Sequence, residues 1–379
     1  MKKICFVTTV SLTVRAFLIP VLRHLKANTD WDIAVICDED PTLPAELPEG
    51  VRYIPVSMKR GVSPAGVGAM LKMRKIFRKE KFDLVQYSTP NAALYASLAA
   101  KFAGIRHRKY HLMGFRFLGF SGWKRGLFKW IEKLACGAST DIECVSASNL
   151  KLGIDEGVFK AEKARVLFYG SSAGVDLSRF DIANKSRWRQ ELRRRFGYGD
   201  HHCVFGFAGR ITGDKGINEL LRAFSRMRDE NARLLLVGTV EEEETLDAQL
   251  LAWARSSDRV TFHPFVMDIE RYYAAMDVLV LPSYREGFGN IIIEAQAMGV
   301  PVIVSDIPGP VDAMEPGTTG LTVPVRNEDA LGAAMETLCT CREDREEMGQ
   351  KGRAFVEKCF DQKKLVEHIL LNRMALLEK

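Results

Sequence analysis

The stretch Ser283-Tyr284-Arg285-Glu286-Gly287-Phe288-Gly289-Asn290-Ile291-Ile292-Ile293-Glu294-Ala295 decides how this chain folds. It follows a continuous apolar run, Val278–Leu281, which is typical of a strand buried on both faces. A short glycine loop comes next, and a helix is predicted from Asn290 to Met298. A strand, a loop and a helix in this order indicate a βα unit of a parallel sheet, where ligands bind beyond the carboxyl ends of the strands.

The loop of this unit is suited to an anion. Gly287 and Gly289 lack side chains and let backbone N–H groups approach a ligand closely. The helix behind them begins with unpaired N–H donors and the positive end of its dipole, which favour a diphosphate. We therefore expect the backbone from Phe288 to Asn290 to complete a phosphate and sugar cradle.

Two carboxylates flank the cradle. Glu286 precedes the helix and Glu294 lies about one turn inside it. Carboxylate oxygens accept hydrogen bonds from vicinal hydroxyls, as in a sugar or a ribose. The alternative is a glutamate favoured by the helix dipole together with an ordinary surface glutamate, and this stretch alone leaves both interpretations open.

A second glycine loop runs from Phe207 to Gly216. Its cations Arg210 and Lys215 are suited to holding a phosphate pair through charge-assisted hydrogen bonds. The loop matches neither the P-loop motif nor the strict dinucleotide-binding fingerprint. The alternative pairs Arg210 with a local carboxylate and leaves Lys215 in solvent.

Strand-like and helix-like runs alternate along the rest of the chain, which predicts two doubly wound α/β sheets of the Rossmann kind. The predicted strands are Lys3–Thr8, Asp32–Cys37, Val51–Val56, Leu84–Gln86, Arg108–His111, Asp141–Val145, Arg165–Phe168, Val204–Ala208, Leu234–Val237, Val260–Phe262, Val278–Leu281 and Val302–Val304. The predicted helices include Val14–Ala27, Ala65–Lys79, Ala92–Phe102, Trp123–Cys136, Lys185–Arg195, Ile217–Arg228, Glu242–Arg255 and Ile269–Met276.

The length of 379 residues predicts two domains, because one core rarely organises so long a chain. We place the boundary in the polar stretch between Gly174 and Asp200, which gives domains 1–175 and 176–360. The last segment, 361–379, is predicted to be a helix that packs back on the first domain.

The charge is unevenly divided. Residues 1–175 hold 27 Lys and Arg against 15 Asp and Glu, a net +12, whereas residues 176–379 have a net charge of −6. Between Arg52 and Lys133 the count is 18 against 3. An excess this concentrated indicates an anionic partner, such as a lipid surface, a phosphorylated acceptor or a nucleic acid. Nucleic-acid binding is the weakest of these, because no reading motif is recognisable.

The eight cysteines are scattered and form no paired or metal-binding motif, which favours a reducing, cytoplasmic compartment. The apolar start of the chain ends at Arg15 without a cleavage site, and no apolar stretch is long enough to span a membrane. We therefore expect a cytoplasmic protein.

Taken together, the motifs resemble glycosyltransferase family 4, whose members are retaining enzymes of the GT-B fold. In that fold two Rossmann-like domains face each other across a cleft. The elements in the family's order are Gly209-Arg210, Lys215-Gly216, Leu236-Val237-Gly238, Ala275-Met276-Asp277-Val278, Glu286 to Glu294, and Gly320-Leu321-Thr322-Val323-Pro324.

The resemblance implies roles for the second domain. Arg210 and Lys215 would neutralise the donor diphosphate, Glu294 would hold the ribose hydroxyls, and Glu286 would hold the transferred sugar. Phe265 and Val266 would lie beside the base of the nucleotide. Members of the family need no metal or other cofactor, and their donor is a nucleotide sugar, which we expect here to be UDP-linked.

The first domain resembles a subset that builds bacterial surface polysaccharides on a polyprenyl diphosphate carrier. The matching stretches are Thr8-Thr9-Val10, Arg15-Ala16-Phe17-Leu18-Ile19-Pro20, His111-Leu112-Met113-Gly114-Phe115-Arg116 and Cys144-Val145-Ser146-Ala147-Ser148. Many relatives have a Gly-Gly pair in the first strand–helix loop, where this chain has Val10-Ser11-Leu12-Thr13.

Three residues are acceptor or cleft candidates: Arg15, His111 and Arg116. Arg15 either grips an acceptor diphosphate or forms a structural salt bridge, and the sequence leaves both open. For His111 a packed or capping role is favoured over a catalytic one.

The segment Phe115–Trp130 mixes aromatic rings with Arg116, Lys124, Arg125 and Lys129. This mixture is typical of a surface that lies in a lipid headgroup layer. The expected partner is the anionic inner face of the plasma membrane, with the protein attached peripherally.

The resulting hypothesis is a retaining glycosyltransferase that moves a sugar from a UDP-sugar to a lipid-linked glycan. Two alternatives remain open: a hydrolysing UDP-sugar epimerase on the same fold, and a non-catalytic nucleotide-sugar-binding partner in an assembly complex.

Overall fold

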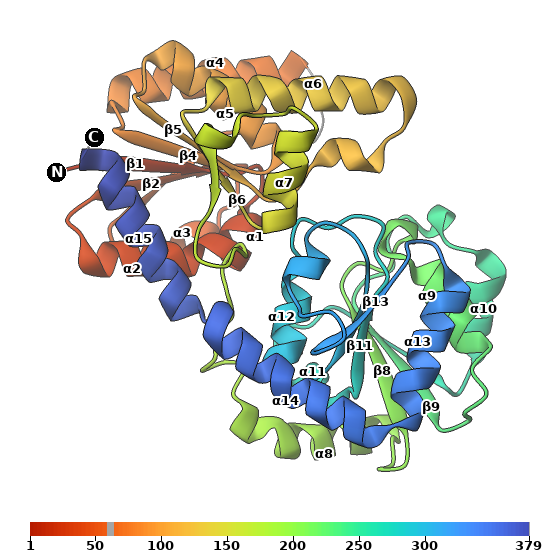
Figure 1. Ribbon diagram of the computed structural model, residues 1–379. Helices are drawn as coiled ribbons and strands as arrows, with labels where there is room; N and C mark the ends of the chain where they lie inside the picture. Colours follow the sequence, from red (N-terminus) through yellow and green to blue (C-terminus); the bar gives the residue numbers. More distant parts are fainter. Residues whose placement is uncertain (59–63, 379) are drawn as a thin grey trace. The chain divides into compact units, whose positions relative to one another are not determined.

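The computed structural model describes residues 1–58 and 64–378, so Lys379, the end of the predicted C-terminal helix, lies outside the described part. The chain divides into two compact units. The first contains Met1–Ala173 and the segment that begins at Gln362, and the second contains Gly174–Asp361. Each is a parallel sheet with helices on both faces, as Figure 1 shows.

The first domain holds a seven-stranded parallel sheet with the order β3-β2-β1-β4-β5-β6-β7. Its strands are β1 (Lys3–Val7), β2 (Asp32–Cys37), β3 (Val51–Pro55), β4 (Leu84–Ser88), β5 (His107–Leu112), β6 (Asp141–Cys144) and β7 (Ala164–Val166). The strand order reverses between β1 and β4. The predicted parallel sheet is confirmed, although β7 ends two residues early, at a turn in which Phe168 has a φ of 53°.

Alternate strand residues enter different cores on the two faces of this sheet. Ile4 and Phe6 pack with α2 (Ile19–Asn28) and α15 (Gln362–Glu378) on one face. Cys5 and Val7 belong to the core on the other face. That face is covered by α4 (Pro64–Glu80), α5 (Pro90–Ala103) and α6 (Gly122–Ala138), with α7 (Ala147–Asp155) near the β6–β7 edge. The short α3 (Leu43–Glu46) packs on the first face, where Leu43 joins the core of α2 and α15.

A buried polar cluster fastens α15 to the first domain. The Arg373 guanidinium donates to Glu143 at 2.6 Å and to the Gln86 amide oxygen at 2.8 Å. Lys109 forms ion pairs with Glu143, at 3.0 Å, and with Asp141. Arg373 and Lys109 are almost completely buried, and removing one partner of such a set leaves an uncompensated buried charge. The last helix is therefore part of the first domain's core.

The first helical segment is longer and less regular than predicted. It begins with α1 (Ser11–Thr13) and widens into a π-turn, η1 (Val14–Leu18), before α2. In the π-turn the N–H of Ile19 donates to the Val14 carbonyl. Pro20 follows directly and has no N–H to continue the ordinary ladder, which accounts for the irregularity at this point.

The second domain holds a six-stranded parallel sheet with the order β10-β9-β8-β11-β12-β13. Its strands are β8 (Cys203–Ala208), β9 (Ala232–Val237), β10 (Val260–His263), β11 (Val278–Leu281), β12 (Val302–Ser305) and β13 (Gly320–Val323). Its helices are α8 (Lys185–Phe196), α9 (Ile217–Ser225), α10 (Ala248–Ser256), α11 (Ile269–Ala275), α12 (Asn290–Ala297), α13 (Glu328–Thr340) and α14 (Arg342–Cys359). Counted from β8, this is the 3-2-1-4-5-6 order of the Rossmann fold. The edge strand β13 was not predicted.

The helix predicted from Glu242 to Arg255 is wrong in its first half. Glu243–Thr245 forms a 3-10 turn, and α10 begins only after Asp247. The Asp247 carboxylate accepts hydrogen bonds from the N–H groups of Gln249 and Leu250, at 3.0 and 3.2 Å. Four consecutive glutamates from Glu241 repel one another in a helix, whereas an aspartate is among the best N-cap residues.

Candidate active site

The main candidate site lies where the strand order of the second domain reverses, beyond the carboxyl ends of β8 and β11. The loops that follow these two strands touch. Gly216 has a φ of 72°, and a Cβ there would lie 2.1 Å from the Pro282 carbonyl oxygen. The N–H of Tyr284 donates to the Asp214 carbonyl at 3.0 Å. A glycine is thus needed for both the backbone conformation and the close approach.

This contact brings Lys215 and Glu286 together. The ammonium of Lys215 lies 2.5 Å from Oε1 of Glu286, and both side chains are mostly buried. The hydroxyl of Ser283 donates to the same oxygen at 2.9 Å. Lys215 is therefore not in open solvent. Ser283 was not among the sequence candidates, although its position two residues after a buried strand is the signal that points to it.

Arg210, the other predicted cation, is exposed. One of its nitrogens lies 3.5 Å from a Glu241 carboxylate oxygen, at the limit of an ion pair. Exposed pairs of this kind contribute little to stability, and such a contact is readily exchanged for one with a ligand. Arg210 and Lys215 thus lie on the same loop but differ in their contacts. Arg210 is loosely paired with Glu241, whereas Lys215 is held by Glu286.

The predicted cradle begins α12. Gly289 has a φ of 87° and occupies the N-cap position, so Asn290 is the first helical residue. A Cβ on Gly309, which follows β12, would lie 2.6 Å from the Gly287 carbonyl oxygen, so a third loop supports the cradle. The Phe288 side chain is buried against Phe360, with ring centroids 5.3 Å apart. Only the backbone of Phe288 is therefore offered to a ligand.

Glu294 lies on α12 and is held by a residue that the sequence did not suggest. Its Oε2 accepts a hydrogen bond from the Tyr273 hydroxyl at 3.0 Å. Burial raises the pKa of Glu294, and the hydrogen bond from Tyr273 partly opposes that rise. Tyr273 itself is fully buried on α11. The sequence did not point to Tyr273, because a tyrosine among apolar residues of a helix is usually a core residue.

Phe265 and Val266 lie in the loop between β10 and α11. Phe265 is 66% exposed and Val266 is partly buried. Arg179 supports the loop, donating to the Met267 carbonyl at 2.6 Å and to Glu270 at 2.7 Å. An exposed aromatic ring on a held loop is suited to stacking against a flat ligand.

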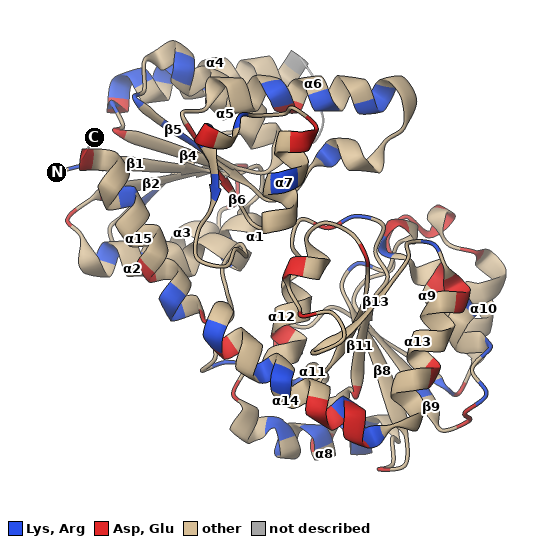
Figure 2. Cartoon of the chain, viewed as in Figure 1, with Lys and Arg blue, Asp and Glu red and all other residues tan. Residues whose placement is uncertain are grey.

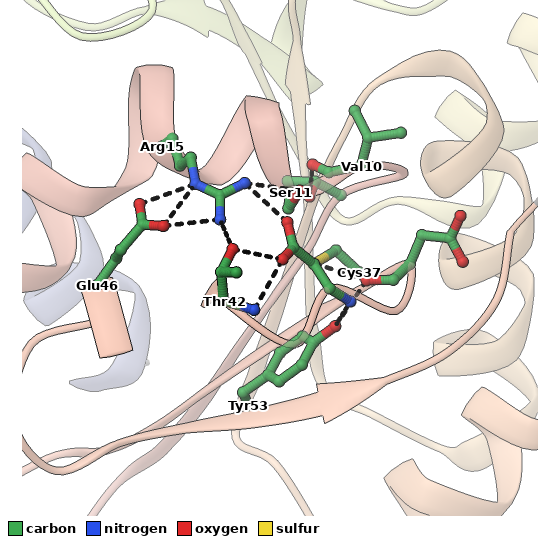
Figure 3. Close-up of polar contacts among 10 residues, drawn as sticks. Val10, Ser11, Arg15, Cys37, Thr42, Glu46 and Tyr53 are labelled. Carbon is green, nitrogen blue, oxygen red and sulfur yellow. Dashed lines mark hydrogen bonds and ion pairs between the residues drawn. The ribbon is translucent and has the colours of Figure 1, made fainter. Parts of the chain in front are cut away.

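In the first domain, Arg15 is a structural cation. Figure 3 shows its guanidinium between two carboxylates, donating to Asp40 at 2.7 Å and to Glu46 at 2.7 to 3.0 Å. The hydroxyls of Ser11 and Thr42, at 3.0 and 2.7 Å, accept its remaining N–H groups. This set holds the pKa of Asp40 far below its ordinary value. Of the two interpretations left open, the geometry supports the salt bridge, which ties the loop after β1 to the one after β2.

In the first domain, the residues that follow β1 and β4, where the strand order reverses, include two threonines whose hydroxyls meet. Thr9 follows β1 and Thr89 follows β4, and their side-chain oxygens lie 2.7 Å apart. Thr89 has a φ of 70°, which is rare for a residue with a branched side chain.

His111 is buried at the end of β5, with Nδ1 3.2 Å from the Ser88 hydroxyl. Burial lowers its pKa to about 4, so the imidazole is neutral near pH 7. The position fits the packed histidine favoured by the sequence.

The aromatic and basic residues of the segment Phe115–Trp130 lie on two different faces. Arg116 lies over the Phe128 ring, 4.7 Å from its centroid, and Phe128 stacks on Phe120. Arg125 and Lys129 both form ion pairs with Glu156, at 2.7 and 2.5 Å. These groups are therefore engaged within the domain and are not the outward surface.

The outward face of α6 consists of other residues. Trp123, Leu127, Trp130 and Leu134 recur at helical spacing and are 74, 43, 57 and 36% exposed. Lys124 and Lys133 are exposed beside them, and Figure 2 shows the basic positions along this helix. Among the described residues, no helix is long and apolar enough to cross a bilayer.

Two doubly wound parallel-sheet domains, each with a reversal of strand order, define the GT-B class of fold. Residues 189–355 match the model of glycosyl transferases group 1, and residues 3–146 match that of glycosyl transferase 4-like proteins. HepE of Anabaena, solved in complex with UDP, superposes with a TM-score of 0.79 over 99% of this chain and 100% of that chain, at 19% identity.

Sequence relatives extend over nearly the whole chain. The capsular polysaccharide biosynthesis glycosyltransferase CapM of Staphylococcus aureus is 31% identical over 97% of this chain and 96% of its own length. The UDP-Gal:alpha-D-GlcNAc-diphosphoundecaprenol alpha-1,3-galactosyltransferase of Escherichia coli is 27% identical, covering 76% of this chain and 74% of the relative. The chain therefore belongs to the glycosyltransferases, in the family 4 group with the GT-B fold, and is a sugar-transferring enzyme.

Proposed function

We propose that this enzyme transfers a sugar, with retention of anomeric configuration, from a UDP-sugar to a polyprenyl-diphosphate-linked glycan in the synthesis of a bacterial surface polysaccharide. The observation that carries the proposal is the meeting of Lys215, Glu286 and the N-terminus of α12 at the strand-order reversal of the second domain. The names of the relatives, which include a capsular enzyme and a diphosphoundecaprenol-dependent one, support the acceptor class.

The donor diphosphate would bind between Arg210, Lys215 and the first N–H groups of α12. As the glycosidic bond breaks, negative charge develops on the leaving diphosphate. Positive groups already in place stabilise that charge without reorganising at the moment of reaction. Arg210 and Lys215 supply this charge in the proposal, and transfer proceeds without a resident metal or other cofactor.

The rest of the donor fits the neighbouring groups. Glu294, oriented by Tyr273, would accept hydrogen bonds from the ribose hydroxyls. The exposed ring of Phe265 and the side chain of Val266 would lie beside uracil.

Glu286 would bind hydroxyls of the transferred sugar. Its carboxylate is held by Lys215 and Ser283, and a carboxylate neutralised in this way is a poor nucleophile. This favours a front-face route, in which the departing phosphate takes the proton of the acceptor hydroxyl and the acceptor oxygen bonds to the same face of the sugar.

A polyprenyl-linked acceptor would require the enzyme to work at the inner face of the plasma membrane. The outward stripe of α6 offers two tryptophans and two leucines beside lysines. Rings of this kind enter the headgroup layer, and cations there are attracted by anionic lipid. The stripe therefore supports peripheral attachment by the first domain.

A transfer assay tests the proposal directly. The protein is incubated with a panel of UDP-, GDP- and dTDP-sugars and with polyprenyl-diphosphate-linked sugars, and the anomeric configuration of the product is read by NMR. We expect turnover with a UDP-sugar and retention of configuration. Inversion of configuration would overturn the front-face route, and turnover with GDP- or dTDP-sugars alone would overturn the uridine assignment.

A further inference from the structure

The second domain contains a separate cavity of about 600 Å³ at the opposite edge of its sheet. Its floor includes Asp277 and Pro301, which directly precede β11 and β12. Its walls come from the start of α8, with the two residues Ile182 and Ala183 before it, and from α14 between Arg342 and Arg353. The candidate donor loops follow the other ends of the same strands, so the cavity shares no lining residue with them.

The lining of this cavity is strongly cationic. Five basic residues line it, namely Lys185, Arg189, Arg342, Arg345 and Arg353, against the two carboxylates of Asp277 and Glu346. Asp277 is shared by two cations, because Arg193, which lies just outside the lining, also forms an ion pair with it. The positive charge is thus concentrated in this one cavity, in a domain whose net charge is negative.

Lys185 shows that this excess is not balanced locally. Its ammonium donates to the Gly299 carbonyl at 2.8 Å, and no ion pair to a carboxylate joins it within the described chain. Burial and the neighbouring Arg189 lower the pKa of Lys185 to about 8. The carboxylates of Asp277 and Glu346 oppose this shift without outweighing it. A largely buried ammonium with no carboxylate in direct contact is uncommon in proteins.

The helix directions add to the positive field. Lys185 is the first residue of α8, and no acidic residue lies in that first turn. A cation at a helix N-terminus is opposed by the dipole, whereas an anion there is favoured. Arg342 likewise begins α14, where Glu343 and Asp344 offset the dipole. The first turn of α8 itself therefore holds no acidic residue, and the carboxylate of Asp181 caps the 3-10 turn (Ile182–Asn184) that precedes it.

We propose that this cavity binds a small molecule carrying two or more phosphate groups. The excess of three positive charges fits a multiply charged anion, and the volume lies in the range of pockets that hold metabolite-sized ligands. Lys185 and the first turn of α8 hold one phosphate group, and Arg342 and Arg345 on α14 hold another. The site is distinct from the proposed donor site and does not depend on the function assigned there.

Calorimetry at fixed ionic strength tests the proposal with two probes, inorganic tripolyphosphate and fructose 1,6-bisphosphate. The titrations use a variant with Arg210→Ala and Lys215→Ala, which removes the candidate diphosphate cations. We expect at least one probe to bind this variant. Binding by tripolyphosphate alone identifies a phosphate chain as the ligand chemistry, and binding by the bisphosphate alone identifies a phosphorylated sugar.

Cavity variants assign the site. Arg342→Ala removes a side chain that is 74% exposed and whose ion pair, with Glu346, lies along its own helix, so folding should be preserved. We expect it to weaken binding about tenfold, the cost of one charge-assisted hydrogen bond, and Lys185→Met to weaken it at least as much. Arg187→Ala, an equal charge change on α8 outside the cavity, should have no effect. Absence of binding by both probes, or an equal loss in Arg187→Ala, would overturn the proposal.

Discussion

Lys215 and Glu286 are 71 residues apart in the sequence, and their charged atoms lie 2.5 Å apart. Each follows one of the two central strands, β8 and β11, between which the strand order of the second domain reverses. Parallel strands direct their carboxyl ends to one edge of the sheet, so residues that follow neighbouring strands meet there. The pair therefore joins the loops that follow β8 and β11, and a donor bound at this edge would contact both residues.

The first prediction concerns Lys215. Lys215→Ala should lower kcat by roughly 10²–10³-fold, because one preorganised charge at the leaving group is lost. Steady-state kinetics with the UDP-sugar donor measure the effect, with Arg255→Ala, an exposed cation paired to Glu243, as the control. A loss of less than tenfold in kcat would reject the diphosphate role.

The two glutamates should separate binding from turnover. Glu294→Gln should weaken UDP binding, because the carboxylate that is proposed to accept hydrogen bonds from the ribose hydroxyls is lost. Glu286→Gln should leave UDP affinity unchanged or higher, since Lys215 is freed from its ion pair, while turnover falls. Calorimetry with UDP, beside rate measurements, checks both variants. Equal UDP affinities in the two variants would refute this division of labour.

Membrane attachment should depend on the outward stripe of α6. Trp123→Ser with Trp130→Ser should abolish the salt-resistant part of liposome binding. Lys124→Glu with Lys133→Glu should remove the part that requires anionic lipid, because each basic residue at such a surface contributes about 1 kcal/mol. Arg125 and Lys129 are not suitable for this test, since reversing them would place like charges beside Glu156.

Co-sedimentation with neutral and anionic liposomes at low and physiological salt measures both parts. The control is Arg228→Glu with Lys358→Glu, which makes an equal charge change in the second domain. Equal capture by neutral and anionic liposomes would rule out the electrostatic contribution. Absence of capture by either would argue against the lipid-linked acceptor.

Glu132 should make stability depend on pH. It is buried on the inner face of α6, where burial raises its pKa to about 7. The folded protein therefore retains a proton that the unfolded chain releases above its ordinary pKa of 4.5, and stability falls as pH rises from about 4.5 to 7. Glu132→Gln removes this penalty and should stabilise the first domain at pH 8 by roughly 3 kcal/mol.

Scanning calorimetry at pH 5 and pH 8 checks this prediction. The stabilisation by Glu132→Gln should be much smaller at pH 5. The control Glu230→Gln, at an exposed position in the second domain, should leave the unfolding temperature unchanged at both pH values. A gain of equal size at both pH values would show that packing rather than titration is responsible.

The βα alternation and the positions of nearly all strands were predictable from the sequence, because the periodicity of apolar residues is a local property. The same holds for the positions of the two glycine loops, because glycine residues are a local feature of the sequence. The close approach of the Pro282 carbonyl to Gly216 was seen only in the structure. Family motifs added an expectation for each site residue, and the group to which the chain belongs is confirmed.

The tertiary structure alone decided which side chains meet. From the sequence, Tyr273 is expected to be an ordinary core residue, yet its hydroxyl donates a hydrogen bond to Glu294. Arg125 is expected to be a free surface cation, yet it forms an ion pair with Glu156. Arg373 in the last helix is buried beneath the sheet by partners more than 200 residues away. Such contacts depend on strand order and helix packing, which bring distant segments together, and no local pattern in the sequence carries that information.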